Sequence, residues 1–177
     1  FDRITRPEQI ISSIQQAIQV MLDPADCGPA CISLSQDVQG EVYEYPEEFF
    51  KERIHTIRRP RPDDFQIKEA AELIKKSKKP IIISGGGVFY SDATNELSAF
   101  ATKHNIPVTQ TVMGYSTMKK DHSHYLGAIG GLGGRAANNL SKETDMAIAI
   151  GTKLADFTTG SWTNFENPDF KLVSINA

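Results

Sequence analysis

The chain has 177 residues, 40% of them hydrophobic and 23% charged, and its formal net charge is −3. That length suits one medium domain, or one domain with part of another, and the composition is ordinary for a globular protein. The weak negative charge, and the lack of any apolar run near the roughly 20 residues of a membrane span, argue against nucleic acid and a membrane as partners. Two cysteines, Cys27 and Cys31, are too few for a disulfide framework or a Cys-based zinc site and indicate a reducing cytoplasm.

The first part of the chain predicts a helix, a strand and a second helix. Thr5-Arg6-Pro7-Glu8 has the form of a capping box, and apolar residues then recur at helical spacing, which predicts a helix over residues 5–22. Asp23-Pro24 ends this helix. We expect a strand in PACISLS, residues 29–35, and a short helix from Glu47 to Ile54.

Residues 58–64, RRPRPDD, predict a linker. Three arginines and two prolines favour an extended, solvated segment that has no core to bury. A nucleic-acid contact is the alternative interpretation of the arginines, but the run is short and has no interleaved aromatic residues. We therefore expect the linker to separate two structural parts.

After the linker, helical patterns alternate with short apolar strands. We expect three helices. The first has an apolar stripe at Ile67, Ala70, Ala71 and Ile74. The second has a cap at Ser91 and an inner face of Leu97, Phe100 and Ala101, and the third covers residues 135–140. We expect strands at residues 80–83, 107–112, 146–150 and 171–175, and a glycine-rich loop at residues 126–134. The predicted fold class is α/β, with an open parallel Rossmann-like sheet covered on both faces.

Three consecutive glycines follow the strand at residues 80–83. Gly85 and Gly87 fit the first two positions of a dinucleotide fingerprint, but Tyr90 occupies the third, where helix and strand must pack closely. The chain also lacks the Gly-Lys-Ser/Thr of a Walker loop. These departures weaken a dehydrogenase interpretation and favour a turn in which Gly85 to Gly87 supply positive φ and close backbone approach.

Residues that directly follow strands are expected at one edge of the sheet. Gly85, Thr111 and Gly151 are such residues, and the glycine-rich loop joins them. The loop glycines suit either a backbone that passes close to something flat or a mobile loop; they are Gly127, Gly130, Gly131, Gly133 and Gly134. A nucleotide-shaped ligand, if one binds, is expected at this edge.

Other chemistry is sparse in the sequence. His122 and His124 stand two apart, but a zinc site needs at least three protein ligands, so we expect a solvated loop and no metal. No Gly-x-Ser-x-Gly elbow is present. Asp156 is close enough to Gly151 to face the same crevice, although a surface carboxylate is the commoner outcome.

Several motifs in order resemble one enzyme family. AAELI, KPIIISGGGV, IPVTQTVMG, DHSHYLGAIGG and AIAIGTKLADF resemble the middle domain of thiamine-diphosphate-dependent enzymes of the acetolactate synthase type. RPEQIISSIQQAI and CGPACISLSQDVQ resemble the end of the pyrimidine-binding domain that precedes it. The resemblance covers essentially the whole chain. It implies a C-terminal part of a pyrimidine-binding domain at residues 1–55, a linker at 56–65, and a central Rossmann-like domain at 66–177 that is incomplete at its C-terminus.

The resemblance also implies what the parent enzyme does. FDRITRPEQ and SQDVQGEVYEYPEEFF are most similar to the branch that hydrolyses a C–C bond of a cyclic 1,2-diketone in myo-inositol breakdown, giving 5-deoxyglucuronate. An acetolactate synthase-like decarboxylase or lyase is the alternative. Family members hold thiamine diphosphate with a glutamate of the first domain, and Mg²⁺ with a Gly-Asp-Gly…Asn motif of the third; neither is present here. Both cofactors are therefore expected outside this fragment.

The fragment itself is then expected to be inactive, with no catalytic residue of its own. Its implied partners are the missing remainder of the parent chain and, in the parent, a small-molecule substrate and further copies in a homo-oligomer. Two other hypotheses remain open. One is a free-standing module that takes up ADP or a dinucleotide at the Gly85 and Gly130 loops, and the other is a purely structural element of a larger assembly.

In some relatives the middle domain holds FAD or ADP. Carried over by motif, the cofactor-binding positions are Gly85, Gly86, Gly87, Thr111, Val112, Leu126, Gly127, Gly151, Lys153 and Asp156. FAD-binding relatives usually show Gly-x-Arg-Phe-Asp-Asp-Arg, where this chain has GTKLADF over residues 151–157, without either arginine. Because lysine lacks the bidentate phosphate contacts and the stacking of arginine, we expect FAD to be absent and the fold to be kept as a spacer.

Overall fold

The computed structural model describes residues 1–25 and 27–176. The chain divides into two compact units, Phe1–Pro60 and Arg61–Ala177, and each is described by itself. None of the described helices has both the length and the apolar character that crossing a membrane requires.

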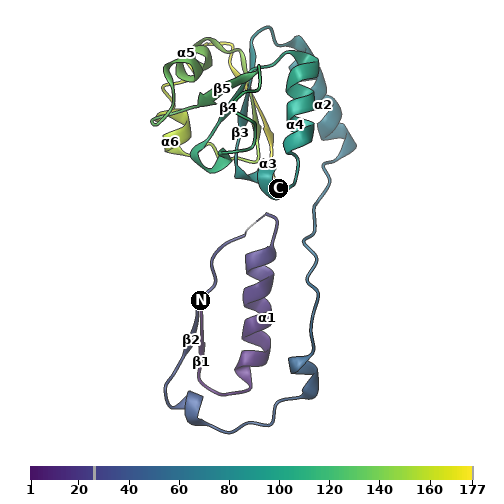
Figure 1. Cartoon of the computed structure of the whole chain (residues 1–177), viewed down its shortest axis with the longest axis vertical. Helices are drawn as coiled ribbons and strands as arrows, with labels where there is room; N and C mark the ends of the chain where they lie inside the picture. The colour runs from purple at the N-terminus through teal and green to yellow at the C-terminus, as the bar shows by residue number, and fades with distance from the viewer. Residues whose placement is uncertain (26, 177) are drawn as a thin grey trace. The chain divides into compact units, whose positions relative to one another are not determined.

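The first unit is a small β–α–β arrangement. Strand β1 (Asp2–Ile4) leads into helix α1 (Gln9–Leu22), which returns the chain to strand β2 (Ile32–Leu34). The two strands pair in parallel (Figure 1), as they must when a helix makes the crossover. Two 3₁₀ turns follow, η1 (Val38–Gly40) and η2 (Glu47–Phe50).

The start of α1 differs from the predicted capping box. The helix begins at Gln9, and the Glu8 side chain makes no capping hydrogen bond. The Gln9 side chain caps the start of the helix instead, because its Oε1 accepts hydrogen bonds from the backbone amides of Thr5 at 2.7 Å and Arg6 at 2.9 Å. The predicted helix over Glu47 to Ile54 is also wrong beyond Phe50, since only one 3₁₀ turn forms.

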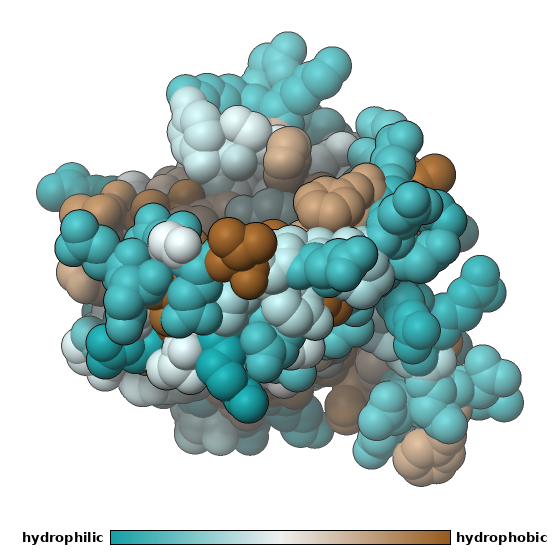
Figure 2. Space-filling view, turned by 90° about the horizontal axis from the view of Figure 1, so that it is seen from below, coloured by the Kyte–Doolittle hydropathy of each residue, from teal (hydrophilic) through white to brown (hydrophobic). Residues whose placement is uncertain are grey.

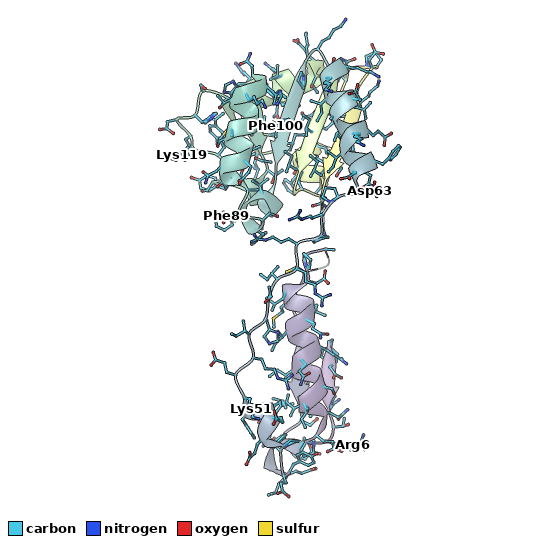
Figure 3. All side chains as sticks on the ribbon, turned by 90° about the vertical axis from the view of Figure 1, so that its right-hand side faces the viewer. Arg6, Lys51, Asp63, Phe89, Phe100 and Lys119 are labelled. Atoms are coloured by element: carbon cyan, nitrogen blue, oxygen red, sulfur yellow. The ribbon has the colours of Figure 1, made fainter. Side chains whose placement is uncertain are left out.

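The second unit alternates helices and strands as predicted. It begins with α2 (Asp64–Lys76), where the Asp63 side chain accepts from the Phe65 amide at 2.7 Å and caps the helix (Figure 3). The remaining elements are β3 (Pro80–Ser84), α3 (Gly86–Tyr90), α4 (Thr94–His104), β4 (Val108–Gln110), η3 (Val112–Gly114), β5 (Tyr125–Ala128), α5 (Arg135–Glu143), β6 (Met146–Ile150), α6 (Asp156–Thr159) and β7 (Lys171–Ile175).

The five strands form one parallel sheet in the order β5-β4-β3-β6-β7. Strand β3 comes first in the chain and lies at the centre, so the order is the one expected of a Rossmann-type sheet. Helices α2 and α4 cover one face, and α5 and α6 lie on the other (Figure 1). The predicted fold class is confirmed.

Alternate residues of the central strands supply two cores. Ile82 and Ile148 are fully buried against Leu97 and Ala101 of α4, and Phe100 packs against the same cluster (Figure 3). Ile81, Ile83 and Ala147 point to the other face and pack with Ala137 of α5. Continuous apolar strands are therefore explained by burial on both faces.

Three details of the second unit differ from prediction. Ser91 does not cap the helix that carries Leu97; that helix, α4, begins at Thr94 without a side-chain cap, and Ser91 instead follows the short helix α3 as its C-cap. The second strand ends at Gln110, since Val112–Gly114 turns into 3₁₀ conformation. The first residues of the predicted glycine-rich loop belong to strand β5 instead.

Candidate functional site

The candidate site lies where the strand order reverses, at the carboxyl ends of β3 and β6. Chain connections leave β3 toward β4 on one side, while β6 lies on its other side. Ligands of open α/β sheets bind outside the carboxyl ends of strands at such a point. Gly85 directly follows β3, Gly151 directly follows β6, and Thr111 follows β4, so the predicted gathering of these three residues at one edge is confirmed.

The glycines at this point pack against each other and leave little room. The Gly87 amide donates to the Gly151 carbonyl at 2.9 Å, and the Gly85 amide donates to the Ile150 carbonyl at 2.8 Å. A Cβ added to Gly85 would lie 2.3 Å from the Gly151 oxygen, and one added to Gly87 would lie 2.6 Å from the Gly151 Cα. The expected close backbone approach is therefore present, with this chain's own backbone as the neighbour.

The expectation of positive φ at Gly85 to Gly87 was wrong. Gly85 has φ −111°, and Gly86 and Gly87 are not among the residues with positive φ. The positive φ of this region is at Gly151, with φ 60°. The three consecutive glycines are thus required by close packing. The left-handed backbone conformation occurs instead at Gly151, directly after the neighbouring strand β6.

The segment after β4 closes a second side of the site. The Thr111 amide donates to the Ser84 carbonyl at 2.9 Å, and the Thr111 hydroxyl accepts from the Gly114 amide at 3.0 Å. A Cβ on Gly86 would lie 3.0 Å from the Met113 oxygen, so α3 and η3 are in close contact. Val112 is exposed at the outer side of this segment. The Thr111 hydroxyl thus caps η3.

Leu126 and Gly127 lie on β5, on the far side of β4 from β3. Both are partly buried, and Gly127 pairs with Thr109 beside an irregularity in the strand register. Gly127 has φ 91° and open space where a Cβ would be. The sheet therefore keeps these two positions apart from the glycine contact at β3 and β6.

The glycine-rich loop is fixed to the protein at several points. Gly130 has φ 94°, and a Cβ there would lie 1.9 Å from the Phe157 oxygen. The Gly131 amide donates to the same oxygen at 2.8 Å. Asn138 of α5 holds the loop from the other side, because its Oδ1 accepts from the Gly130 amide at 2.9 Å and its Nδ2 donates to the Gly130 carbonyl at 3.0 Å. The loop glycines permit close approach to residue 157, which the alternatives of a flat ligand or a mobile loop did not anticipate.

Lys153 and Asp156 lie on the exposed segment after β6. Both side chains are exposed, and neither forms an ion pair within the described part of the chain. Leu154 between them has φ 47°, an unusual conformation for a branched side chain. Asp156 begins α6, a helix of four residues.

The sequence reasoning missed a buried polar layer beneath the site. The Ser84 hydroxyl donates to the Thr109 carbonyl and lies 2.7 Å from the Thr117 hydroxyl. Thr117 donates to the Gly114 carbonyl at 2.8 Å and accepts from Gln110 Nε2 at 3.2 Å. The signal was a run of polar residues, Thr109-Gln110-Thr111, at the end of an otherwise apolar strand.

Exposed aromatic and apolar side chains surround the carboxyl edge of the sheet, and the sequence reasoning also missed these. Each lies on a segment that follows a strand; they are Phe89, Tyr90, Val112, Met113, Tyr115, Leu132, Phe157 and Trp162. Figure 3 shows Phe89 at the end of α3, turned away from the sheet. No signal in a single sequence distinguishes such residues from core positions, since burial depends on the completed fold.

Two backbone amides at the switch point are not free to bind a diphosphate. A phosphate cradle needs free amides at the glycine turn, but the Gly85 and Gly87 amides already donate to carbonyls of the chain. The neighbouring backbone also fills the space that the missing Cβ atoms leave. Among the described residues, no three His, Cys, Asp or Glu side chains gather where they could hold a metal ion.

Comparison with known proteins gives a consistent result. The family model described as "Thiamine pyrophosphate enzyme, central domain" matches residues 67–177. A 3D-(3,5/4)-trihydroxycyclohexane-1,2-dione hydrolase from Clostridium botulinum is 49% identical over 176 residues, which are 99% of this chain and 27% of the relative. The protein of the same name from Bacillus subtilis is 48% identical over 176 residues, 99% of this chain and 28% of that protein. The chain thus spans between a quarter and a third of the length of these curated relatives.

A solved structure from Mycobacterium smegmatis, assigned to the thiamin diphosphate-dependent enzymes, has a similar fold. Its TM-score is 0.70 at 19% sequence identity, and the match covers 97% of this chain and 32% of that one. At this identity the likeness concerns the fold alone.

Proposed function

The chain belongs to the thiamine pyrophosphate enzymes, whose central domain it contains, and we propose that its parent is a 3D-(3,5/4)-trihydroxycyclohexane-1,2-dione hydrolase. The observation that carries this proposal is 49% identity over 176 residues to a relative of that name. The identity extends through the first unit, beyond the residues that the family model matches. The proposed reaction hydrolyses a C–C bond of a cyclic 1,2-diketone in myo-inositol catabolism and gives 5-deoxyglucuronate.

We assign the parts of the parent as follows. Residues 1–55 form the C-terminal part of a pyrimidine-binding domain, residues 56–65 a linker, and residues 66–177 a central domain. Two features support this assignment: the chain divides between Pro60 and Arg61, and residues 51–63 form no helix or strand. The β–α–β arrangement of the first unit is also suited to be part of a larger parallel sheet, because two strands alone are marginally stable.

In the proposed reaction, water adds a hydroxyl to the carbonyl carbon and a proton to the carbon released from it. When bound, thiamine diphosphate would supply a nucleophilic carbon and an electron sink for the cleavage of this bond, and no residue of this chain is proposed to hold it. We propose that thiamine diphosphate and Mg²⁺ bind to residues outside this chain, which contains no Gly-Asp-Gly sequence. The fragment alone is then inactive.

The proposed role of the second unit is to hold the carboxyl edge of its sheet in a fixed shape. Gly87 is bonded to Gly151, and Asn138 fixes Gly130, so the loops at this edge are tied to one another. Positions 85–87, 111–112, 126–127, 151, 153 and 156 are then a vestigial nucleotide site. Occupied amides and a lysine where FAD-binding relatives have arginine support this interpretation. Isothermal titration with FAD tests it, and micromolar affinity would contradict it.

The parent is further proposed to be a cytoplasmic homo-oligomer that acts on a small molecule. The relatives are more than three times as long as this chain, which supports a missing remainder as its first partner. Exposed Val20 and Met21 on α1 are apolar positions that such a remainder would cover.

The decisive experiment uses the complete open reading frame. With thiamine diphosphate and Mg²⁺, the purified parent is expected to convert the cyclic diketone to 5-deoxyglucuronate. NMR spectra of the reaction mixture measure the product. The 177-residue chain under the same conditions is expected to give no product. Formation of acetolactate from pyruvate would instead support the decarboxylase alternative, and turnover by the chain alone would contradict the assignment of catalysis to the missing parts.

A further inference from the structure

A small hollow lies beyond the carboxyl end of β4. It has a volume of about 210 Å³ and is lined by Gln110, Tyr115, Ser116, Met118, Lys119 and Lys120. Gln110 is the last residue of the strand, and the other residues belong to the loop that follows η3. Figure 3 shows Lys119 on the outer side of the unit. The volume suits one small organic molecule and is below that of a typical drug-sized site.

The buried residue of this hollow is Gln110, which is 2% exposed. Its Nε2 donates to the Thr117 hydroxyl and to the Met118 carbonyl, both at 3.2 Å. Because a carbonyl oxygen only accepts, these bonds fix which end of the amide is nitrogen. The opposite end, Oε1, is therefore turned away from Thr117 and Met118.

Oε1 of Gln110 has no donor among the described residues. Every side-chain nitrogen or oxygen that is sealed from solvent has a hydrogen-bond partner within the described part of the chain. Oε1 has none, so it keeps a small area in contact with solvent, and Gln110 is one of the residues that line the hollow. The hollow thus offers one oriented acceptor, held by a buried side chain, to a donor from outside.

The rim of the hollow carries positive charge. Neither Lys119 nor Lys120 forms an ion pair among the described residues, and the adjacent Asp121 is not paired with either of them. Lys120 Nζ lies 5.1 Å from the centre of the Tyr115 ring, which holds this ammonium group over the loop. A hydrogen bond to Tyr115 and the charge of its phenol raise the pKa of Lys120. Two ammonium groups at one rim that form no ion pair among the described residues attract an anion.

We propose that this hollow binds a small hydroxylated anion, a polyol that carries a phosphate or a carboxylate. A ligand hydroxyl donates to Gln110 Oε1, the anionic group lies near Lys119 and Lys120, and the Tyr115 ring and Met118 side chain cover the carbon skeleton. The site is independent of the activity proposed for the parent, because it uses only groups of this loop and of β4.

The test uses the whole 177-residue chain and NMR of the ¹³C-labelled methionine methyl groups. Glycerol 3-phosphate and D-gluconate represent the two anionic sources. At least one is expected to shift the Met118 methyl resonance to saturation, with a Kd of about 1 mM or tighter. Glycerol lacks the charge and acetate lacks the hydroxyls, so both are expected to bind at least about tenfold more weakly. The preferred probe identifies the source as a phosphate or a carboxylate.

Variants separate the two kinds of contact. The double substitution Lys119→Gln and Lys120→Gln is expected to weaken binding at least about tenfold, whereas Lys68→Gln, an exposed lysine of α2, leaves it unchanged. Gln110→Met has a similar volume and is expected to abolish the preference for glycerol 3-phosphate over inorganic phosphate. If Gln110→Met does not fold, that same preference in the unaltered chain tests the hydroxyl contact.

Three results would overturn the proposal. They are the absence of saturable binding by either hydroxylated anion, shifts confined to methionines other than Met118, and an unchanged affinity in the double lysine variant. In the first case the Gln110 oxygen is simply hydrated.

Discussion

The two units of the chain differ in how much core they have. Among the described residues of the second unit, sixteen apolar residues are buried, and those of β3 and β6 pack against helices on both faces of the sheet. Among the described residues of the first unit, only Ile4 and Val38 are buried apolar residues. Its helix α1 buries a serine, Ser13, and leaves Val20 and Met21 exposed.

This difference teaches that regular secondary structure and independent stability are separate properties. The helix and the paired strands of the first unit form regular backbone hydrogen bonds, but they do not bury enough apolar surface to offset the entropy of ordering. Figure 2 shows apolar side chains exposed among hydrophilic ones at the surface. The second unit has the layered core that a domain needs, so the two are expected to respond very differently to being separated.

Separation of the units is expected to have the largest effect. Residues 61–177 alone should fold and unfold cooperatively, with a free energy of unfolding of about 5 kcal/mol or more. Residues 1–60 alone should remain largely unfolded, because two three-residue strands and one helix provide no closed core. Amide dispersion in NMR spectra and urea unfolding measure both pieces.

The control is the intact chain, whose urea transition should match that of residues 61–177 within error. A cooperative transition of residues 1–60 by themselves would contradict the comparison. Loss of folding in residues 61–177 would show that the second unit also depends on the first.

A second prediction tests the close packing at the carboxyl edge. Gly130→Ala is expected to destabilise the chain by about 3 kcal/mol, because its Cβ would lie 1.9 Å from the Phe157 oxygen at a positive φ. Gly127→Ala is a matched control with nearly the same φ, 91° against 94°, and open space for its Cβ. Its free energy of unfolding is expected to fall by about 1 kcal/mol, because alanine is less favourable than glycine in a left-handed backbone conformation.

Urea unfolding of the two variants gives the difference between them, which isolates the steric part. Equal losses of unfolding free energy in the two variants would mean that the loop moves away from residue 157 at little cost. The loop would then be the mobile element that the glycine content also allowed.

The layered fold could be predicted because its strands are continuous apolar runs. Residues 146–150 and 171–175 were predicted to the residue, since an apolar run between turn signals suits a strand buried on both faces. β5 was missed because Tyr125–Ala128 contains a glycine and is only partly buried, as an edge strand can be. β1 was missed because three residues carry no periodicity.

The candidate site was predictable only in part, for a physical reason. Glycines after strands indicate close approach, and this held for Gly85, Gly87 and Gly130. What they approach, the backbone at residues 151 and 157, depends on contacts distant in the sequence. The orientation of the Gln110 side chain could not be predicted either, since it results from hydrogen bonds that its nitrogen makes to a loop that follows η3.

A third prediction concerns the amino ends of the strands, where Asp145, the residue before β6, bonds through its side chain to the turn between α2 and β3. Partial burial opposes it, yet hydrogen bonds from the Ser77 hydroxyl and the Lys78 and Lys79 amides hold the pKa of Asp145 below its usual value. A lowered pKa in the folded state means that the carboxylate stabilises the fold above its unfolded pKa of about 4. This contribution is lost as the pH falls through the folded pKa.

Asp145→Asn is therefore expected to cost about 1–2 kcal/mol near neutral pH, and the difference from the unaltered chain should shrink below about pH 4. Urea unfolding across this range measures it. Asp169→Asn, an exposed carboxylate near β7, is the control and should change little at any pH. A loss for Asp145→Asn that does not depend on pH would show that shape at this position matters more than charge.

The smallest effect is expected from an ion pair on the surface of the same unit. Lys142 Nζ lies 2.7 Å from Glu166 Oε1, but the two side chains are 44% and 58% exposed. Water screens such a pair, and holding two long side chains in place costs entropy, so Lys142→Gln should lower the free energy of unfolding by no more than about 0.5 kcal/mol. Thermal unfolding at low and high salt, with Lys68→Gln alongside, measures it. A loss above about 1 kcal/mol would mean that the pair fastens α5 to the segment before β7. The stability of the second unit would then rest on its surface as well as on its two buried layers.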